Sequence, residues 1–279
     1  LFSLLSDRVR LAAKAHLEKK RYVASLIDLG EEGPLASLVM AANGAPLLDL
    51  SRAVSLVGMA GLNELVLLHR GEELHKSEKA RAFGLEVVRR LADTAAETGR
   101  SLDIPILAGQ THAETTAYRF ARLDLKHHSP RAGRAVRGNL ARGELYYTNS
   151  THLSLSVPMD PFERARLEGV CHPHLPAFPI TQIWLGEERP PADRVVRYLD
   201  RVFRETACSC VSLSPEFTSC PDCLSVERGL RDACGHCGSA RVEQIVIHHI
   251  PPEQVGRVQP VTDVELPAAL LNQGESVFK

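Results

Sequence analysis

The sequence has no apolar run long enough to cross a membrane and no excess of charge of either sign. Its longest apolar stretches, such as residues 35–40 and 65–68, fall far short of the roughly 20 residues that span a bilayer. Lys and Arg together number 33, against 34 for Asp and Glu, which gives a net charge of -1. Membrane spanning is therefore excluded. A general nucleic-acid coat protein is disfavoured, because a neutral chain has no overall field for a polyanion.

A signal peptide is also missing, as are internal repeats and low-complexity segments. Residues 1–5 run into a helical pattern without a basic start or a small-residue cleavage site. The first residue is Leu1 rather than methionine, which predicts a piece of a longer chain. The chain has 279 residues, of which 44% are apolar and 24% charged. This composition is typical of a folded globular protein with one large domain or two ordinary ones.

Helical and strand patterns alternate along the first two hundred residues. Apolar residues recur at helical spacing over 4–17, 56–68, 80–95, 117–123, 161–168 and 192–205. Strand-forming runs lie at 103–108, 144–157, 177–185 and 207–213. Asp49 or Ser51 is expected to cap the second helix, while Ser77 and Gly99 are expected to bound the third. The alternation predicts an α/β body.

The composition changes near the C-terminus. From residue 219 it is rich in Cys, Gly and polar residues, and residues 241–250 form an apolar, β-branched run. We therefore predict a boundary near residue 206. It separates a partial α/β region at 1–206 from a metal-binding module and tail at 207–279.

Two cysteine pairs give the strongest local signal. They are Cys220-Pro-Asp-Cys223 and, ten residues later, Cys234-Gly-His-Cys237. Each pair forms a knuckle that directs two sulfurs to one point, and four thiolates complete a closed, structural zinc site. His236 lies between two of these ligands and is the alternative donor. Close pairs of this kind favour metal ligation in a reducing compartment, which predicts a cytoplasmic protein.

The other cysteines and histidines carry weaker signals. Cys208 and Cys210 are one residue apart, so on a strand they share a face, and we expect buried apolar thiols. Cys171 lies in a Cys-His-Pro-His loop for which ordinary polar contacts are expected. The pairs 127–128 and 248–249 are nonspecific histidine pairs, the first in a basic loop and the second on the last strand.

A strand-to-helix turn at Thr111-His-Ala-Glu114 allows two interpretations. Thr111 and Glu114 match a capping box, which predicts a well-capped helix. Alternatively, the backbone N–H groups of residues 113–116, with the hydroxyls of Thr115 and Thr116, hold an anion such as a nucleotide phosphate at the positive end of the helix.

A dense polar row follows at residues 146–152, Tyr-Tyr-Thr-Asn-Ser-Thr-His. Side chains of this kind are costly to bury without partners. The row therefore lines a polar cleft or lies on a sheet edge.

Taken in order, these segments resemble the C-terminal part of the anaerobic, class III ribonucleoside-triphosphate reductases, which are glycyl-radical enzymes. The segments that carry the resemblance are 53–64, 71–72, 111–115, 118–120, 123–124, 146–153, 161–162, the four cysteines and 271–275. The similarity covers nearly the whole chain.

The resemblance implies a fold and an activity. The fold is the later part of a ten-stranded α/β barrel with outer helices, followed by a small zinc-ribbon module. The activity is reduction of ribonucleotides to deoxyribonucleotides by radical chemistry. Implied partners are a ribonucleoside triphosphate, a radical-SAM activating enzyme and a second copy of the chain; no membrane or nucleic acid is implied. The substrate-binding residues that we expect are Thr111, His112, Ala113, Glu114, Thr115, Thr116, Tyr147, Asn149 and His152.

Two features depart from the family pattern. The family's zinc module leads to an Arg-Val-x-Gly-Tyr motif whose glycine carries the radical, whereas residues 241–250 contain no glycine, and neither Gly256 nor Gly274 has that sequence around it. The cysteine that forms the thiyl radical belongs to an earlier part of the family's barrel. We expect the chain alone to be inactive. The alternative is a radical-dead paralogue that binds nucleotides as a regulatory or scaffolding protein. Near-zero charge and the lack of aromatics at 219–240 oppose a third option, a zinc-ribbon nucleic-acid binder.

Overall fold

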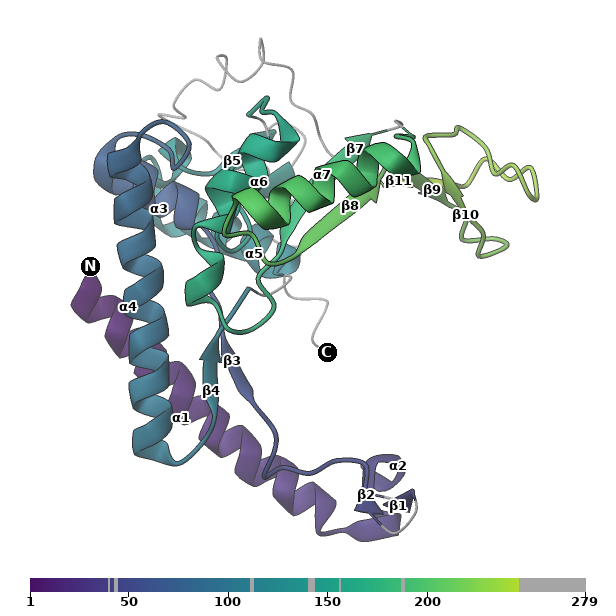
Figure 1. The fold of residues 1–279 in the computed structure, drawn as a ribbon. Coiled ribbons are helices and arrows are strands. Elements are labelled where there is room, and N and C mark those ends of the chain that lie inside the picture. Colours follow the sequence, from purple (N-terminus) through teal and green to yellow (C-terminus); the bar gives the residue numbers. More distant parts are fainter. Residues whose placement is uncertain are drawn as a thin grey trace. The chain divides into compact units, whose positions relative to one another are not determined.

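The computed structural model describes residues 1–39, 41–42, 45–110, 113–139, 144–155, 157–186 and 189–245 (Figure 1). Two compact units share the chain. The first comprises Leu1–Gly58, Leu85–Gln110 and His174–Phe178, and the second comprises Met59–Gly84, Thr111–Pro173 and Pro179–Lys279. Each unit is described by itself below.

The first unit combines long helices with a small parallel sheet. Its elements are α1 (Phe2–Ile27), η1 (Gly30–Glu32), α2 (Ala36–Val39), β1 (Ala41–Ala42), β2 (Ala45–Pro46), β3 (Ser55–Val57), the C-terminal part of α4 (Glu78–Leu102) and β4 (Ile106–Ala108). Strands β3 and β4 are parallel, with Ser55 opposite Ile106 and Val57 opposite Ala108. Parallel pairs need a crossover connection. Here the crossover includes α3 (Leu62–Arg70) and α4.

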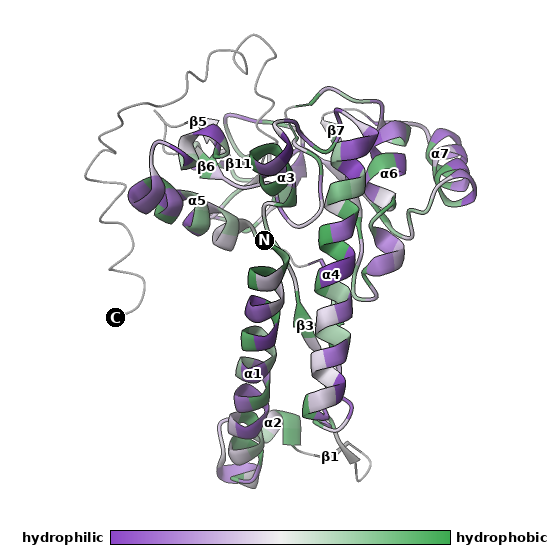
Figure 2. Ribbon diagram, turned by 90° about the vertical axis from the view of Figure 1, so that its left-hand side faces the viewer, coloured by the Kyte–Doolittle hydropathy of each residue, from purple (hydrophilic) through white to green (hydrophobic). Residues whose placement is uncertain are grey.

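Helix α1 packs against β3 in this unit, and Figure 2 shows β3 in the hydrophobic colour. Val9 and Ala13 on the inner face of the helix are buried. His16 Nε2 lies 2.9 Å from the carbonyl oxygen of Leu56. The predicted helix at 4–17 is thus confirmed, and it extends further at both ends.

The second predicted helix is partly wrong. Leu56 and Val57 belong to β3, and the helix α3 begins only at Leu62, after Gly61 at φ 82°. Only a short turn, which contains a left-handed glycine, separates the apolar strand from the apolar helix. The two elements therefore appear as one continuous apolar pattern in the sequence. Asp49 caps no helix, because its Oδ1 accepts from the backbone and hydroxyl of Ser51 within a local turn.

The start of α4 matches the prediction, but its end does not. Ser77 Oγ accepts from the Ala80 N–H at 3.1 Å, as an N-cap residue does. Gly99 lies inside the helix, which continues to Leu102 and is followed by Asp103 at φ 53°. A Cβ at Gly99 would lie 2.8 Å from the Ile104 carbonyl oxygen. The glycine therefore permits the chain to return closely past its own helix.

A third backbone segment extends the sheet of the first unit. Gly109, just after β4, forms a parallel bridge with Ala177, and the Ala177 N–H donates to the Ala108 carbonyl at 3.2 Å. A Cβ at Gly109 would lie 2.5 Å from the Ala177 carbonyl oxygen. This close approach explains why glycine occupies that position.

The second unit contains the remaining elements. They are α3, α5 (Glu114–His128), η2 (Ala132–Arg134), β5 (Arg137–Asn139), β6 (Glu144–Tyr146), α6 (Pro161–Gly169), η4 (His172–His174), β7 (Thr181–Gly186), α7 (Ala192–Glu205), β8 (Val211–Pro215), β9 (Phe217–Ser219), β10 (Val226–Arg228) and β11 (Glu243–Ile245). Strands β7 and β8 are parallel, β5 and β6 form an antiparallel pair, and the last three form a sheet in the order β10-β9-β11.

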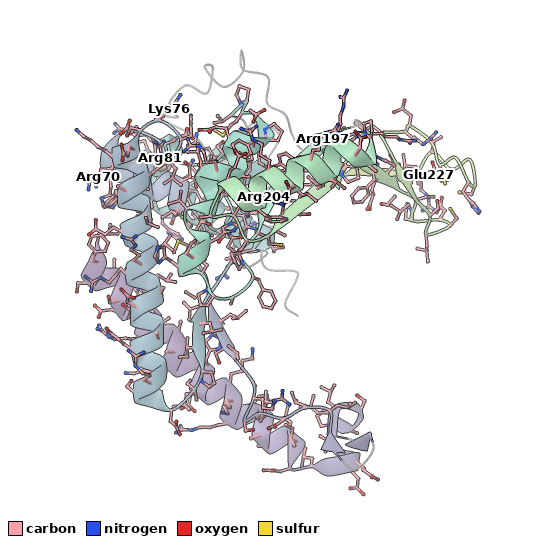
Figure 3. The ribbon with its side chains drawn as sticks, viewed as in Figure 1. Arg70, Lys76, Arg81, Arg197, Arg204 and Glu227 are labelled. Atoms are coloured by element: carbon pink, nitrogen blue, oxygen red, sulfur yellow. The ribbon has the colours of Figure 1, made fainter. Side chains whose placement is uncertain are left out.

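Helix α7 has the predicted bounds and lies beside α6. Val202 is its buried anchor, in a cluster with Ala165 and Cys208. Its opposite face is charged, and Figure 3 shows Arg197 and Arg204 projecting from it. Exposed ion pairs such as these contribute little stability, so the apolar anchor holds the helix in place.

Several predicted boundaries shift. The strand expected at 144–157 is only β6, since the Thr148 N–H donates to the Glu64 side chain instead of to a strand. The strand at 207–213 begins at Val211, so Cys208 and Cys210 precede it; Cys208 is buried and Cys210 is exposed, which corrects the expectation for the latter. The histidine pair 127–128 ends α5 rather than lying in a loop. The pair 248–249 lies outside the described residues.

No helix in the described part of the chain is long and apolar enough to cross a membrane. The α/β character is confirmed. The ten-stranded barrel and the boundary near residue 206 stay predictions.

Candidate functional site

The sulfur atoms of Cys220, Cys223, Cys234 and Cys237 form a tight cluster in which all four lie within 4.8 Å of one another. Cys220 Sγ is 3.6 Å from Cys237 Sγ, and Cys223 Sγ is 3.6 Å from Cys234 Sγ. A tetrahedron with Zn–S bonds of about 2.3 Å has S···S edges of about 3.8 Å. The four cysteines therefore fit a metal ion such as zinc.

The two knuckles, 220–225 and 234–239, have the same backbone hydrogen bonds. In each, the N–H of the first cysteine donates to the carbonyl five residues on, at 2.9 and 2.8 Å. The residue after the second cysteine donates back to the first at 2.9 Å, and that residue, Leu224 or Gly238, has a positive φ. This repeated turn is what brings two sulfurs of one short segment to a common point.

Hydrogen bonds to Cys223 and Cys234 favour the thiolate form of these two residues. Ser225 Oγ lies 3.1 Å from Cys223 Sγ and 3.2 Å from Cys234 Sγ. The Ser225 hydroxyl, together with the N–H groups of Cys237 and His236, lowers the pKa of Cys234 to about 6. Sequence spacing did not reveal Ser225. Its signal is the shared position of Ser225 and Ser239, each two residues after the second cysteine of a knuckle.

The knuckles are also joined outside the sulfur cluster. Asp222 accepts from the Ser239 hydroxyl and from the Arg241 guanidinium. Glu227 accepts from the Gly235 N–H at 3.2 Å, and Figure 3 labels its place on β10. His236 is not part of the cluster of potential ligands among the described residues. The all-cysteine set is therefore the one the fold assembles.

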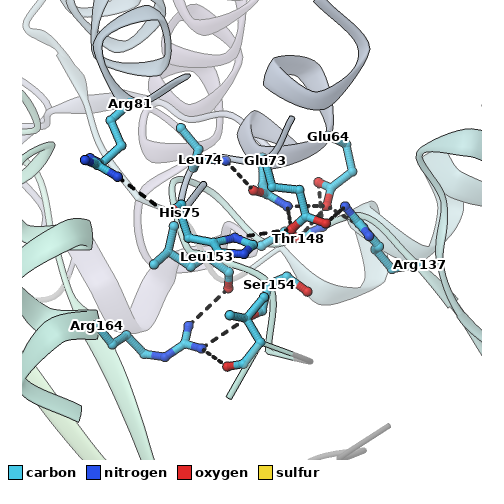
Figure 4. Close-up of polar contacts among 12 residues, drawn as sticks. Glu64, Glu73, Leu74, His75, Arg81, Arg137, Thr148, Leu153, Ser154 and Arg164 are labelled. Atoms are coloured by element: carbon cyan, nitrogen blue, oxygen red, sulfur yellow. Dashed lines mark hydrogen bonds and ion pairs between the residues drawn. The ribbon is translucent and has the colours of Figure 1, made fainter. Parts of the chain in front are cut away.

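A second constellation surrounds the polar row that follows β6. Glu64, fully buried on α3, accepts from the Thr148 N–H at 3.0 Å and from the Thr148 hydroxyl at 2.6 Å. Arg137 Nε donates to the same carboxylate at 3.2 Å, and its Nη2 lies 2.8 Å from Glu73 Oε1 (Figure 4). Asn63 Nδ2 donates to Glu73 at 3.1 Å. These bonds hold the start of the polar row.

The other end of the row is held by α6. Glu168 is buried, and its Oε1 accepts from the Leu153 N–H at 3.0 Å and from Arg164 Nη1 at 3.1 Å. His152 Nδ1 lies 3.1 Å from the second oxygen, Oε2. Arg164 also donates to the carbonyl oxygens of Leu153 and Ser154 (Figure 4).

Tyr147 and Asn149, which were predicted to line a substrate site, lie within this polar row. The Tyr147 hydroxyl donates to Asp124 Oδ2 at 2.9 Å, and burial, followed by this bond, raises the pKa of Tyr147. Asn149 forms a backbone bridge with Ala60. Both residues therefore carry internal contacts, and their role toward a ligand stays a prediction.

The N-terminus of α5 differs from the predicted capping box. The helix begins at Glu114, with Ala113 as the N-cap residue and no side-chain cap. The Ala117 N–H makes the first helical bond, to the Ala113 carbonyl at 2.7 Å. Thr115 is exposed and Thr116 is half-buried. Thr111 and His112 lie outside the described residues, as does the side chain of Glu114.

Cys171 and His172 are more buried than a loop with ordinary contacts suggests. Burial raises the pKa of Cys171 to about 12. Burial also lowers the pKa of His172 to about 4, and the Ser209 N–H donates to its Nδ1 at 3.0 Å. Both side chains are therefore neutral parts of the core at pH 7.

Sequence reasoning missed the charged groups that hold the polar row: the buried Glu64, Arg164 and Glu168, and the half-buried Arg137. Glu64 lies inside a segment that carried the resemblance, and Arg164 and Glu168 stand four apart on a predicted helix. The i, i+4 spacing of opposite charges is the available signal. It does not distinguish a buried pair from an exposed one.

Comparison with known proteins decides the family. The sequence model of the family described as "Anaerobic ribonucleoside-triphosphate reductase" matches residues 1–247. The chain belongs to this family. Among curated members, the reductases of Salmonella typhimurium strain LT2 and Escherichia coli strain K12 are 27% and 26% identical to it over 176 residues. That alignment covers 60% of this chain and 24% of each reductase, so the chain spans about a quarter of their length.

Solved structures of anaerobic reductases share the fold. A structure titled "Anaerobic ribonucleotide reductase" matches with a TM-score of 0.65 at 18% identity, covering 87% of this chain and 35% of that one. The Thermotoga maritima reductase in complex with dATP and CTP matches with a TM-score of 0.64 at 17% identity, covering 87% and 37%. These likenesses establish the fold of part of a reductase.

Proposed function

We propose that the chain is a portion or relative of an anaerobic ribonucleoside-triphosphate reductase that binds a ribonucleoside triphosphate and, in a complete enzyme, serves its reduction to the deoxyribonucleotide. The observation that carries this proposal is the family match over residues 1–247. A reductase of the same fold has been crystallised with dATP and CTP. The chain alone is expected to be inactive.

The triphosphate is assigned to the N-terminus of α5. The N–H groups of the first turn have no acceptor within the helix, and Ala113 provides no side-chain cap. Such a terminus carries a partial positive charge that favours a phosphate group. Thr115 and Thr116 add hydroxyl donors, and the sequence-predicted set of Thr111, His112, Glu114, Tyr147, Asn149 and His152 completes the site.

Zinc is assigned to the four cysteines as a structural ion. The cluster supplies four sulfur ligands and leaves no position for substrate, which is the pattern of closed sites. When bound, the ion cross-links the two knuckles, which the three-stranded ribbon and the hydrogen bonds of Asp222 and Glu227 also join. The remaining partners that the family implies, a radical-SAM activating enzyme and a second copy of the chain, are part of the proposal.

Calorimetric titration of the protein expressed from its complete reading frame tests the nucleotide site. We expect a ribonucleoside triphosphate to bind and Thr115→Asp to weaken binding by at least tenfold, because the added carboxylate repels phosphate. The same carboxylate stabilises the helix terminus, so the variant stays folded. Ser101→Asp, at an exposed position on α4, is the matched control. Equal affinity for Thr115→Asp and the unchanged protein would refute the assignment.

The second candidate function is a radical-dead paralogue that binds nucleotides as a regulatory or scaffolding protein. It is favoured by the absence of glycine from residues 241–250, where the resemblance places the radical motif. Electron paramagnetic resonance after treatment with a radical-SAM activating enzyme tests it. A glycyl radical signal from this chain would exclude this candidate, and its absence together with nucleotide binding would favour it.

A further inference from the structure

Among the described residues, the ring of His152 has one hydrogen-bond partner, a buried carboxylate. In the described part of the chain, the ring makes a single hydrogen bond, from Nδ1 to Glu168 Oε2 at 3.1 Å. The Glu168 side chain is 1% exposed, whereas the His152 side chain is 16% exposed. One edge of the imidazole therefore faces a buried carboxylate, while its Nε2 has no described partner.

Glu168 determines which nitrogen carries the proton. An ionised carboxylate only accepts hydrogen bonds, so the Nδ1 that meets it must be the N–H nitrogen. The carboxylate is held in this orientation, because its other oxygen accepts from Leu153 N–H and Arg164 Nη1. This leaves a lone pair on Nε2 if the ring is neutral.

The Glu168 carboxylate already has a charged partner within the fold. This partner is the Arg164 guanidinium at 3.1 Å. The other titratable groups whose charge Glu168 influences are Cys171, His172, Tyr198 and Cys208. Burial raises the pKa of the thiols and of the phenol, and it lowers the pKa of His172, so all four are neutral at pH 7. The Arg164 guanidinium is thus the counter-charge that the fold supplies to this carboxylate.

We propose that Glu168 is a positioning residue that holds His152 as a neutral imidazole protonated on Nδ1, so that Nε2 accepts a hydrogen bond from a hydroxyl or amino group of the bound nucleoside. The ligand half of this proposal rests on the proposed function. The predicted site then has two parts with different roles. The N-terminus of α5 binds the phosphates, and His152 binds a donor group of the sugar or base.

Histidine tautomers are measured directly by long-range proton–nitrogen NMR of protein labelled with ¹⁵N-histidine. At pH 7.5 we expect His152 to show the Nδ1–H tautomer, with the signal assigned through its loss in His152→Gln. An Nε2–H tautomer or a doubly protonated ring would overturn the proposal, because either form makes Nε2 a donor suited to phosphate.

An isosteric variant provides a second test. In Glu168→Gln one oxygen becomes an NH2 donor, and the remaining oxygen is retained by two donors, Leu153 N–H and Arg164. The NH2 group then faces Nδ1, so the His152 proton is expected to move to Nε2. Glu163→Gln, an exposed change on the same helix, should leave the tautomer as it was. An unchanged tautomer in folded Glu168→Gln would contradict a positioning role for Glu168.

Binding measurements test the ligand half separately. His152→Gln is expected to weaken binding of a ribonucleoside triphosphate about tenfold, the loss expected for one hydrogen bond, and to leave binding of inorganic tripolyphosphate unchanged. Equal losses for both ligands would show that His152 binds phosphate, against the proposal. If neither ligand binds the unchanged protein, the proposed function fails, while the NMR result still decides the tautomer.

Discussion

At the residue scale, single buried groups explain contacts that the sequence pattern does not reveal. His172 follows a cysteine and precedes a proline, and nothing in that short motif indicates that it is buried among β7 and the segment before β8. The same holds for Glu64, whose polar partner Thr148 is 84 residues away. Burial of a polar group depends on such distant partners, and a local pattern contains no information about them.

The buried neutral His172 predicts a pH-dependent stability. Its Nδ1 accepts from the Ser209 N–H, so a protonated ring would place two donors against each other. Because burial lowers its folded pKa to about 4, the unfolded chain binds this proton more readily below its pKa of about 6.5. This contribution to the free energy of unfolding is fully present above pH 6.5. It is lost as the pH falls toward 4, which lowers the free energy of unfolding by about 3 kcal/mol.

Urea unfolding between pH 7 and pH 4.5 measures this loss. His172→Gln should be less stable at pH 7 and should lose less stability on acidification than the unchanged protein. His127→Gln, an exposed position at the end of α5, serves as the comparison. Parallel pH profiles for the unchanged protein and His172→Gln would rule out this titration.

At the element scale, periodicity predicted most helices well, and the errors have physical causes. Helix α7 was predicted at its observed bounds because its apolar stripe and charged face are separated clearly. The helix expected over 56–68 was right only from Leu62 onward, because a buried parallel strand and a buried helix both appear as apolar runs. Gly99 was misread as a helix end, since the sequence does not show the returning backbone at Ile104.

Two glycines in α4 allow a matched test of that explanation. Gly99→Ala places a Cβ 2.8 Å from a backbone oxygen, whereas Gly84→Ala meets the flexible end of the Leu74 side chain. Alanine is the better helix former by about 1 kcal/mol at both positions. We expect Gly99→Ala to destabilise the protein by about 1–3 kcal/mol and Gly84→Ala to change stability much less. Thermal unfolding of both variants provides the measurement, and a stabilised Gly99→Ala variant would contradict the close approach.

At the scale of the whole molecule, spacing predicted the cysteine cluster, and the fold confirms that all four sulfurs meet. The polar row was also noticed from composition, but its buried partners on α3 and α6 were not. The family was predicted from the resemblance of several segments in order, because hydrophobic periodicity alone does not identify a family. The nucleotide-binding role of residues 111–116 stays a prediction, since it depends on a ligand rather than on contacts within the chain.

The metal should be essential to the C-terminal ribbon. We expect one zinc per chain, lost in Cys234→Ser and retained in Cys210→Ser, an exposed cysteine outside the cluster. Zinc binding in comparable modules contributes on the order of 10 kcal/mol, so its loss should make residues 217–245 sensitive to proteases. Metal analysis combined with limited proteolysis checks both effects. Protease resistance that survives complete zinc removal would show that the ribbon folds without metal.

The most direct measurement of the account is native mass spectrometry of the protein from its complete reading frame, titrated with the four ribonucleoside triphosphates. We predict a protein that carries one zinc ion and gains one nucleotide mass per chain. A folded protein that contains no zinc and gains no nucleotide would contradict the account.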